Sequence, residues 1–220
     1  MAIHVFYDNS NIWGGAQKLR SESEEEVPWV ALRISYTHIF NLLEQGRHAH
    51  TKVLGGSVPP SCEELWEFAR SRHYETNLLK RVEKDDGSIG EQGVDELLHL
   101  KIANTLIDYP KSDILVVATG DGRMSEFGTG FLAQVHRAIK LGWRVEIWSW
   151  TGVCSRKYIT LQKANADQVK LIPIDSHYAA VTFVKPGHYY RMVDGNREDF
   201  DLIGRRSTAL GALDPNLYFA

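Results

Sequence analysis

Two aspartates directly follow apolar runs of the sequence, at the points where buried strands are expected to end. Asp8 follows Ile3–Tyr7, and Asp121 follows Ile114–Ala118 after a Thr-Gly step. Short continuous runs rich in β-branched residues are typical of strands buried on both faces of a parallel sheet. In such sheets ligands bind at the carboxyl ends of the strands, and neighbouring strands lie about 5 Å apart. If these two strands are neighbours, both aspartates are expected in one crevice.

A third carboxylate, Asp95, follows a Gly-Val turn and opens a helix expected over 94–106. Three carboxylates in one crevice repel one another, and their pKa values rise unless a cation compensates the charge. Mg²⁺ and Mn²⁺ prefer oxygen ligands and keep waters that a substrate phosphate can replace. The pattern therefore favours a metal site formed by Asp8, Asp95 and Asp121. The alternative is that they are, separately, a turn residue, a helix cap and a loop residue.

Strands and helices are expected to alternate along most of the chain. Strands are predicted over 3–7, 51–58, 74–82, 114–118, 143–148 and 169–174, and helices over 27–45, 62–72, 94–106, 127–141 and 156–165. Such alternation is typical of βαβ units, so the predicted fold class is α/β with a doubly wound, mostly parallel sheet. The acidic stretch Glu22–Glu26 is expected to be solvated.

In the last part of the chain, the alternation of predicted strands and helices ends. We expect a domain over 1–176 and a C-terminal extension over 177–220 that packs on it. Within the extension, Ala180–Lys185 and Tyr189–Val193 flank a Pro-Gly pair and predict a small hairpin or the addition of a strand at the edge of a sheet. The tail that follows has little periodicity.

Composition excludes several classes of protein. A net charge of -3 gives no overall attraction to nucleic acid, so such binding would require a local basic patch. No apolar stretch approaches the roughly 18 residues of a membrane span, and the amino terminus is expected to be a strand and not a leader. Cys62 and Cys154 lack paired spacing, which favours a reducing, cytoplasmic location. His48 and His50 are expected in a solvated loop and not in a zinc site.

Three known patterns match parts of the sequence incompletely. The segment from Asp8 to Ser10 is similar to the metal-dependent adhesion site of von Willebrand A domains, but that site requires a serine where this chain has Ile12. The Gly128–Ala133 segment matches the dinucleotide-binding string, yet it begins ten residues after the preceding strand, and the acid Glu146 lies inside a strand. A phosphatase nucleophile at Asp8 would require an acid in place of Ser10.

Three short motifs occur together in one order along the chain. They are Phe6–Asn11, Gly93–Asp95 and Val117–Asp121, followed by Gly142 and an apolar strand. In this order they resemble an NYN domain of the PIN-like nuclease superfamily, over roughly residues 3–175. The resemblance implies a Rossmann-like sheet of strand order 3-2-1-4-5, a divalent metal ion and cleavage of RNA.

By motif position, the resemblance implies catalytic and metal-ligand roles for Asp8, Asp95 and Asp121, and site-organising roles for Asn11 and Thr119. The implied cofactor is Mg²⁺ or Mn²⁺, and the implied partner is single-stranded RNA. Attack by water, and not by a 2′-hydroxyl, would leave 5′-phosphate and 3′-hydroxyl ends. A homo-oligomer is a further expectation, and a membrane partner is not expected.

The chain departs from the family pattern at two positions. Arg123 stands where family members commonly carry a second aspartate, and Lys101 lies near the place of a further acid on the middle helix. Glu126 is the candidate to replace the missing aspartate as a metal ligand. Arg123 could instead bind a phosphate, for which a planar guanidinium is well suited, or it could be a solvated loop residue.

Residues that could contact nucleic acid flank the same crevice. Trp13 follows the first strand, and Arg156 and Lys157 follow the fifth; aromatic stacking combined with basic side chains is how single strands are usually held. Trp148 and Trp150 alternate along a strand and are expected to pack in the core. The predicted function is a metal-dependent ribonuclease. The alternative is an RNA-binding or regulatory NYN-like protein whose nuclease centre has decayed.

Overall fold

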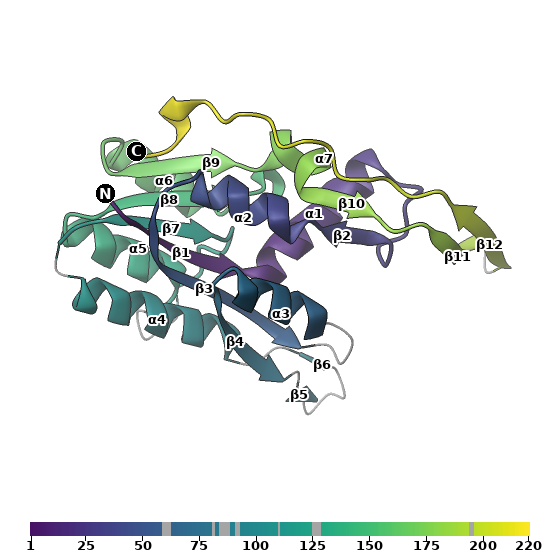
Figure 1. The fold of residues 1–220 in the computed structure, drawn as a ribbon, viewed down its shortest axis with the longest axis horizontal. Helices are drawn as coiled ribbons and strands as arrows, with labels where there is room; N and C mark the ends of the chain where they lie inside the picture. The colour runs from purple at the N-terminus through teal and green to yellow at the C-terminus, as the bar shows by residue number, and fades with distance from the viewer. Residues whose placement is uncertain are drawn as a thin grey trace.

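A parallel sheet of six strands forms the centre of the molecule (Figure 1). The structure, a computed structural model, describes residues 1–58, 63–80, 82–83, 89–90, 93–109, 111–124, 129–193 and 196–220. In spatial order the strands are β4 (Glu75–Lys80), β3 (Ala49–Val58), β1 (Ile3–Asp8), β7 (Ile114–Ala118), β8 (Arg144–Ser149) and β9 (Val169–Pro173). All neighbours pair in parallel, so their carboxyl ends lie at one edge. The predicted α/β class with a mostly parallel sheet is confirmed.

The two strands that carry the candidate aspartates are neighbours at the centre of this sheet. β1 and β7 pair directly, with Tyr7 opposite Ala118. All side chains of both strands are buried. This two-sided burial explains why each strand reads as a continuous apolar run and not as an alternating one.

Helices cover both faces of the sheet. One face is covered by α1 (Asn9–Ser23), α2 (Tyr36–Glu44) and α3 (Glu63–Ser71), and the other by α4 (Val94–Asp108), α5 (Phe131–Lys140) and α6 (Arg156–Ala164). Successive side chains of a strand point to opposite faces. Accordingly Val5 and Tyr7 belong to the first core, and Phe6 belongs to the second.

The helix α1, which begins directly after β1, was not predicted. It buries only a narrow stripe formed by Ile12, Gly15 and Ala16, so its apolar periodicity is weak. The glycine in this stripe has a packing role, because a Cβ atom at Gly15 would lie 2.1 Å from the Trp150 ring. The Trp150 indole also donates to the Ile12 carbonyl oxygen at 2.8 Å. The position of α1 is therefore fixed by a long-range contact with Trp150, although the helical pattern in its own sequence is weak.

The prediction of one helix over 27–45 is wrong. The segment contains a short strand, β2 (Leu32–Ile34), before α2 begins at Tyr36. β2 pairs in antiparallel with β10 (Thr182–Val184), which comes from the C-terminal region. Because its partner is distant in sequence, the local helical spacing of apolar residues was misleading.

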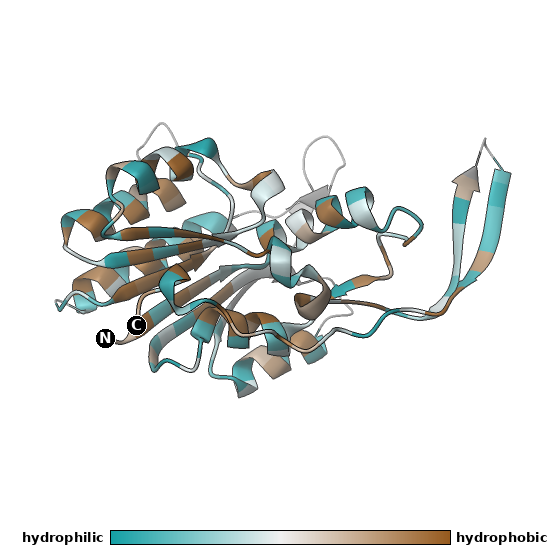
Figure 2. Cartoon of the chain, turned by 90° about the horizontal axis from the view of Figure 1, so that it is seen from above, coloured by the Kyte–Doolittle hydropathy of each residue, from teal (hydrophilic) through white to brown (hydrophobic). Residues whose placement is uncertain are grey.

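The predicted hairpin around the Pro-Gly pair is also wrong. β10 pairs with β2, and the hairpin is formed one strand later by β11 (Gly187–Val193) and β12 (Asn196–Leu202). This hairpin projects from the body of the molecule (Figure 2). Pro186-Gly187 therefore marks the exit from β10 and not the turn of a hairpin.

Beyond β12 the chain returns along the body toward the end of the molecule where both termini lie (Figures 1 and 2). Leu213 and Phe219 are buried in the core of the first face, so the extension does pack on the domain. Shorter elements are β5 (Val82–Glu83), β6 (Ile89–Gly90), α7 (Tyr178–Val181) and three 3₁₀ turns at Thr151–Val153, Asp175–His177 and Pro215–Leu217.

Cys154 is a free, half-buried thiol, whereas Cys62 lies outside the described residues. His48 and His50 are both exposed, but the prediction of a loop is wrong for His50, which belongs to β3 and stacks on the Tyr109 ring at a centroid distance of 5.5 Å. Among the described helices, each is too short or too polar to cross a membrane.

Candidate active site

Asp8 lies at the carboxyl end of β1 and forms the N-cap of α1. Its Oδ1 atom accepts a hydrogen bond from the backbone N–H of Asn11 at 3.0 Å, which satisfies one of the free donors at the helix start. Its Oδ2 atom accepts a hydrogen bond from the Thr119 hydroxyl at 2.9 Å. With only 3% of the residue exposed, the carboxylate is held in one orientation by two strands.

The exit of β7 is connected to the start of α1 by a second set of hydrogen bonds. The side-chain oxygen of Asn11 accepts from the Gly120 N–H at 2.6 Å. The Thr119 hydroxyl oxygen accepts from the Asp121 N–H at 3.1 Å while its proton goes to Asp8. Asn11 and Thr119 therefore have the positions expected of site-organising residues.

The loop after β8 packs closely on the exit of β7. A Cβ atom at Gly120 would lie 2.7 Å from both the Ser149 hydroxyl and the Val153 carbonyl oxygen, so only glycine fits there. The Ser155 N–H donates to the Gly120 carbonyl oxygen at 3.0 Å. The Tyr158 hydroxyl donates to the Asp121 carbonyl oxygen at 2.6 Å. These contacts fix the backbone from which the Asp121 side chain projects.

The three predicted aspartates line one pocket of about 510 Å³ at this edge of the sheet. Asp8 contributes from β1, Asp121 from the exit of β7, and Asp95 from the first turn of α4. The α4 helix begins after Gly93, whose φ of 81° is the left-handed conformation that glycine adopts readily. The remaining lining residues are Ser10, Asn11, Gly120, Gly122, Arg123, Val153, Ser155 and Lys157.

Burial and repulsion together raise the pKa of Asp8 to about 7. Burial is the largest cause, and the negative charges of Asp95 and Asp121 add to it. The hydrogen bonds from Asn11 and Thr119 act in the opposite direction but do not compensate. Burial beside two further carboxylates thus disfavours the charged form of Asp8, and a positive counter-charge in the pocket would favour it.

A nearby imidazole does not supply that counter-charge. His99 lies one turn beyond Asp95 on α4, with its ring edge-on to Phe131 at a centroid distance of 4.5 Å. Its two ring nitrogens are buried and have no hydrogen-bond partner among the described residues. Burial lowers the pKa of His99, although the charges of Glu96 and Asp121 oppose this shift. Its surroundings therefore favour the neutral imidazole.

The donor set of the pocket fits a hard divalent cation in chemistry and charge. It offers carboxylate oxygens from Asp8, Asp95 and Asp121, and a cation would offset the repulsion that adds to the effect of burial on the pKa of Asp8. The spacing is looser than that of a formed centre. Within the described part of the chain, no three His, Cys, Asp or Glu side chains are grouped closely enough to hold an ion.

Of the other predicted site residues, some line the pocket and others do not. Arg123 lines it with a side chain that is 93% exposed, and its Nε atom lies 3.8 Å from Asp121 Oδ1. Lys157 also lines the pocket. Glu126 lies outside the described residues. Lys101, near the place of a further family acid, forms an ion pair with Glu75.

Two predicted nucleic-acid contacts do not line the pocket. Trp13 is half-buried on α1 and packs edge-on to Trp29 at 6.1 Å, because α1 begins immediately after β1 and directs this side chain toward the first core. Arg156 is exposed at the start of α6, and the pocket is lined by its neighbour Lys157 instead. Trp148 and Trp150 are buried in the core, as predicted.

Sequence reasoning missed several residues that shape the pocket. Ser155 caps α6 by accepting from the Lys157 N–H, and a serine directly before a helical run is a signal that could have identified it. Ser10 lies beside Asp8 in the first motif and also lines the pocket. Tyr158, whose hydroxyl donates to the Asp121 carbonyl oxygen, carries no comparable signal, because this bond depends on how the fold brings α6 next to the segment that follows β7.

No protein-family model matches this chain, and no curated protein matches it. The fold is similar to the crystal structure of a protein of unknown function from Vibrio parahaemolyticus. The two have a TM-score of 0.52 and 15% sequence identity over 78% of this chain and 91% of that chain. At this identity the similarity shows the fold alone.

Proposed function

We propose that the protein is a metal-dependent ribonuclease that hydrolyses phosphodiester bonds in single-stranded RNA, with Mg²⁺ or Mn²⁺ as its cofactor. The observation that carries the proposal is the position of Asp8. This carboxylate is almost fully buried, points into a pocket lined by two further aspartates, and has a pKa raised to about 7. Burial disfavours the charged form of this carboxylate at neutral pH, and strongly perturbed carboxylates in a pocket are typical of functional sites.

The residues of the chain would divide the work as follows. Asp8, Asp95 and Asp121 would hold the cation, and Thr119 and Asn11 would keep Asp8 and the β7 exit in place. When bound, the cation lowers the pKa of a coordinated water and offsets charge that develops on the phosphate. At the rim of the pocket, Arg123 and Lys157 would contact phosphate groups.

Topology and motif order support the same assignment. When the six strands of the central sheet are numbered along the chain, their spatial order is 3-2-1-4-5-6. This order contains the 3-2-1-4-5 arrangement of the PIN-like superfamily, which the NYN-like motifs of the sequence suggest. The structural neighbour adds no functional information, because its function is unknown.

The direct test is cleavage of a labelled single-stranded RNA in Mn²⁺ by the wild type and by Asp121→Asn. We expect the wild type to produce 5′-phosphate and 3′-hydroxyl ends, and the variant to lose cleavage while it retains its fold. The matched control is Asp201→Asn on β12 of the hairpin, where the side chain is 90% exposed and does not line the pocket. Products with 2′,3′-cyclic phosphate ends, or equal cleavage by all three proteins, would refute the proposed chemistry.

A second candidate function is RNA binding without cleavage. It is favoured by Arg123 in place of a family acid and by the loose spacing of the three carboxylates. In the same assay this function predicts that the wild type and Asp121→Asn are equally inactive, and that both bind the RNA with measurable affinity.

A further inference from the structure

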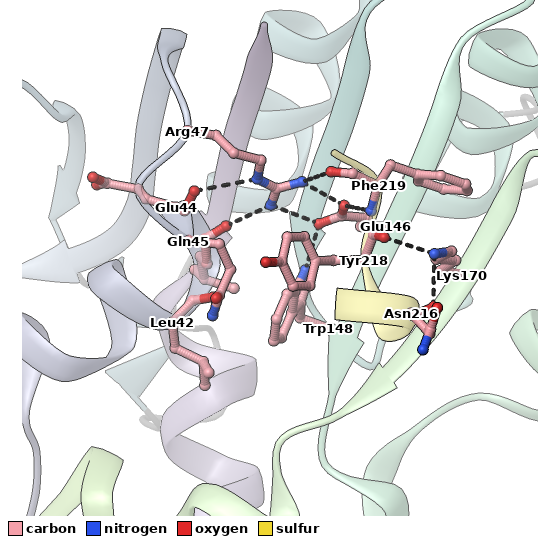
Figure 3. Close-up of polar contacts among 11 residues, drawn as sticks. Leu42, Glu44, Gln45, Arg47, Glu146, Trp148, Lys170, Asn216, Tyr218 and Phe219 are labelled. Atoms are coloured by element: carbon pink, nitrogen blue, oxygen red, sulfur yellow. Dashed lines mark hydrogen bonds and ion pairs between the residues drawn. The ribbon is translucent and has the colours of Figure 1, made fainter. Parts of the chain in front are cut away.

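The C-terminal segment covers a part of the sheet that the helices leave open. On the first face, α1, α2 and α3 pack over the strands around β1, and the side chains of Phe219 and Leu213 complete this core. Figure 3 shows the residues around Phe219, which come from α2, β8, β9 and the end of the chain. We define the tail groove as the site formed by the residues that contact Tyr218 and Phe219, namely Arg47, Arg144, Glu146 and Lys170.

The polar centre of the tail groove is a buried ion pair between Glu146 and Arg47. Glu146 is completely buried in the middle of β8. Arg47 forms two hydrogen bonds with its carboxylate, Nη1 to Oε1 at 2.6 Å and Nη2 to Oε2 at 2.9 Å. The indole of Trp148 donates to the same carboxylate at 3.1 Å.

The body of the protein holds this pair in place without the tail. The Arg47 guanidinium donates to the carbonyl oxygens of Leu43 and Glu44 at the end of α2, at 3.0 and 3.2 Å. A cation at this position also interacts favourably with the helix dipole. The tail groove is therefore preorganised by α2 and β8, and preorganisation lowers the entropic cost of binding a ligand.

The same ion pair forms hydrogen bonds with the backbone N–H and carbonyl oxygen of one residue of the tail. The Phe219 N–H donates to Glu146 Oε1 at 2.7 Å, and the Phe219 carbonyl oxygen accepts from Arg47 Nη1 at 2.6 Å. Both bonds are charge-assisted and buried, and such bonds are among the stronger ones in proteins. Proline is excluded at this position, because it has no N–H to donate.

Cations around the groove contact the tail's carbonyl oxygens and aromatic rings. The Lys170 ammonium donates to the Asn216 and Tyr218 carbonyl oxygens at 2.7 and 2.6 Å and lies 4.6 Å from the centre of the Phe219 ring. Arg144 lies 5.3 Å from that ring, and Arg47 lies 5.0 Å from the Tyr218 ring. Three cations thus lie beside the two aromatic rings of the tail, an arrangement that is favoured electrostatically by the electron-rich faces of the rings.

The segment that leads to the groove is held more sparsely. Residues 206–214 contain no helix or strand, and their backbone is tied by a bond from the Thr208 N–H to the Ala179 carbonyl oxygen. The dense contacts begin again at Asn216. We call residues 206–219 the strap. Few hydrogen bonds hold its first part, and many hold its last residues, from Asn216 to Phe219.

We propose that the tail groove is a peptide-recognition site, whose ligand is an extended segment with two consecutive aromatic residues, here supplied by the chain's own Tyr218 and Phe219. The site selects a backbone N–H and carbonyl at the second aromatic residue and two aromatic rings that face cations. Docking of the tail is a reversible, local event separate from folding of the sheet. This proposal is independent of the nuclease proposal.

The first test uses the full chain with Tyr218→Ala and Phe219→Ala, which removes both rings from the groove. The probe is a fluorescent peptide of residues 213–219 with blocked ends, followed by anisotropy. We expect saturable binding to the double variant and much weaker binding to the wild type, whose tethered tail competes at a high effective concentration. A peptide with N-methylphenylalanine at the last position lacks the N–H donor and should bind roughly ten- to a hundred-fold more weakly.

Equal binding of the two peptides, or no saturable binding to a folded double variant, would overturn the proposal. Circular dichroism establishes whether the variant is folded. A second measurement needs no variant. In native-state hydrogen exchange of the wild type, amides of 214–219 should exchange faster than those of β8, because the strap opens locally. Exchange of both segments only through global unfolding would show static packing and refute reversible docking.

Discussion

The Thr119 hydroxyl donates a hydrogen bond of 2.9 Å to Asp8, and this bond joins the carboxyl ends of two parallel strands that are 111 residues apart in sequence. The same hydroxyl oxygen accepts from the Asp121 N–H at 3.1 Å. The Thr119 side chain thereby orients the carboxylate of Asp8 and holds the backbone of Asp121, which are both candidate metal ligands. The position of Asp8 relative to Asp121 consequently depends on a residue that is not itself acidic.

Replacement of Thr119 by valine tests this connection. Thr119→Val keeps the shape of the side chain but leaves Asp8 Oδ2 and the Asp121 N–H without their partner. We expect the free energy of unfolding at pH 8 to fall by about 2 kcal/mol, measured by urea denaturation. Thr119→Ser keeps the hydroxyl and is the control; a loss as large as that of valine would mean that packing of the methyl group, and not the hydrogen bond, is responsible.

The raised pKa of Asp8 predicts an unusual dependence of stability on pH. Because the folded-state pKa is about 7 and the unfolded value is 3.8, the native state binds the proton more tightly. In the absence of a bound cation, the contribution of Asp8 to stability is thus most favourable below about pH 4. It falls as the pH rises toward 7 and is constant above that.

The variant Asp8→Asn separates this charge from the hydrogen bonds. Asparagine removes the charge but cannot accept from both Asn11 and Thr119. Relative to the wild type, we expect the variant to be less stable at pH 5 and more stable at pH 8 by about 1–2 kcal/mol, measured in EDTA by urea denaturation. A difference between the two proteins that does not vary with pH would contradict the pKa assigned to Asp8.

Cation binding should stabilise the folded protein. The unfolded chain does not gather Asp8, Asp95 and Asp121, so an ion that binds the pocket shifts the unfolding equilibrium by mass action. We expect Mn²⁺ to raise the Tm of the wild type and to raise that of Asp121→Asn much less. The same titration of Asp201→Asn should match the wild type, and equal shifts in all three proteins would place the ion elsewhere.

Arg123 distinguishes a phosphate contact from a solvated side chain. Its guanidinium is 93% exposed and only loosely associated with Asp121, so it is available to a substrate. We expect Arg123→Ala to weaken RNA binding or cleavage by roughly ten- to a hundred-fold and to leave Mn²⁺ affinity unchanged or slightly higher. Arg123→Asp places a further carboxylate at the pocket and should increase Mn²⁺ affinity. Wild-type values for both variants in all three measurements would mean that Arg123 is only a surface residue.

The buried pair of Arg47 and Glu146 is a separate determinant of stability. Arg47→Met leaves Glu146 buried without its counter-charge, and we expect the unfolding free energy to fall by about 3–5 kcal/mol. Adding Glu146→Gln to Arg47→Met removes the unpaired buried charge and should recover part of the lost unfolding free energy. A double-mutant cycle by chemical denaturation measures the coupling, and additive losses would show that the two side chains act independently.

The central strands and the three aspartates could be predicted from the sequence, because the relevant signals are local. A short continuous apolar run such as Ile114–Ala118 reports burial on both faces, and a parallel strand must end at the edge where ligands bind. Asp8 and Asp121 could therefore be placed at one edge before their surroundings were known. The position of Asp95 at the pocket could be expected in the same way from its place in the first turn of a helix.

Tertiary structure decided the features that depend on partners distant in sequence. β2 exists because β10 pairs with it, and α1 is fixed by Trp150 against Gly15. Trp13 faces the first core and not the pocket for the same reason. Such contacts cannot be predicted from local sequence patterns, because each side chain acquires its role only from a partner that is distant in sequence.

Glu146 is the clearest example of this limit. In the sequence it is an acid inside a strand, a position that argues only against a dinucleotide site. In the fold it is a fully buried carboxylate that binds Arg47 and the Phe219 N–H. The sequence by itself determined that this residue lies on a buried strand, but its charge is tolerated only because the tertiary structure brings a guanidinium and a backbone donor to it.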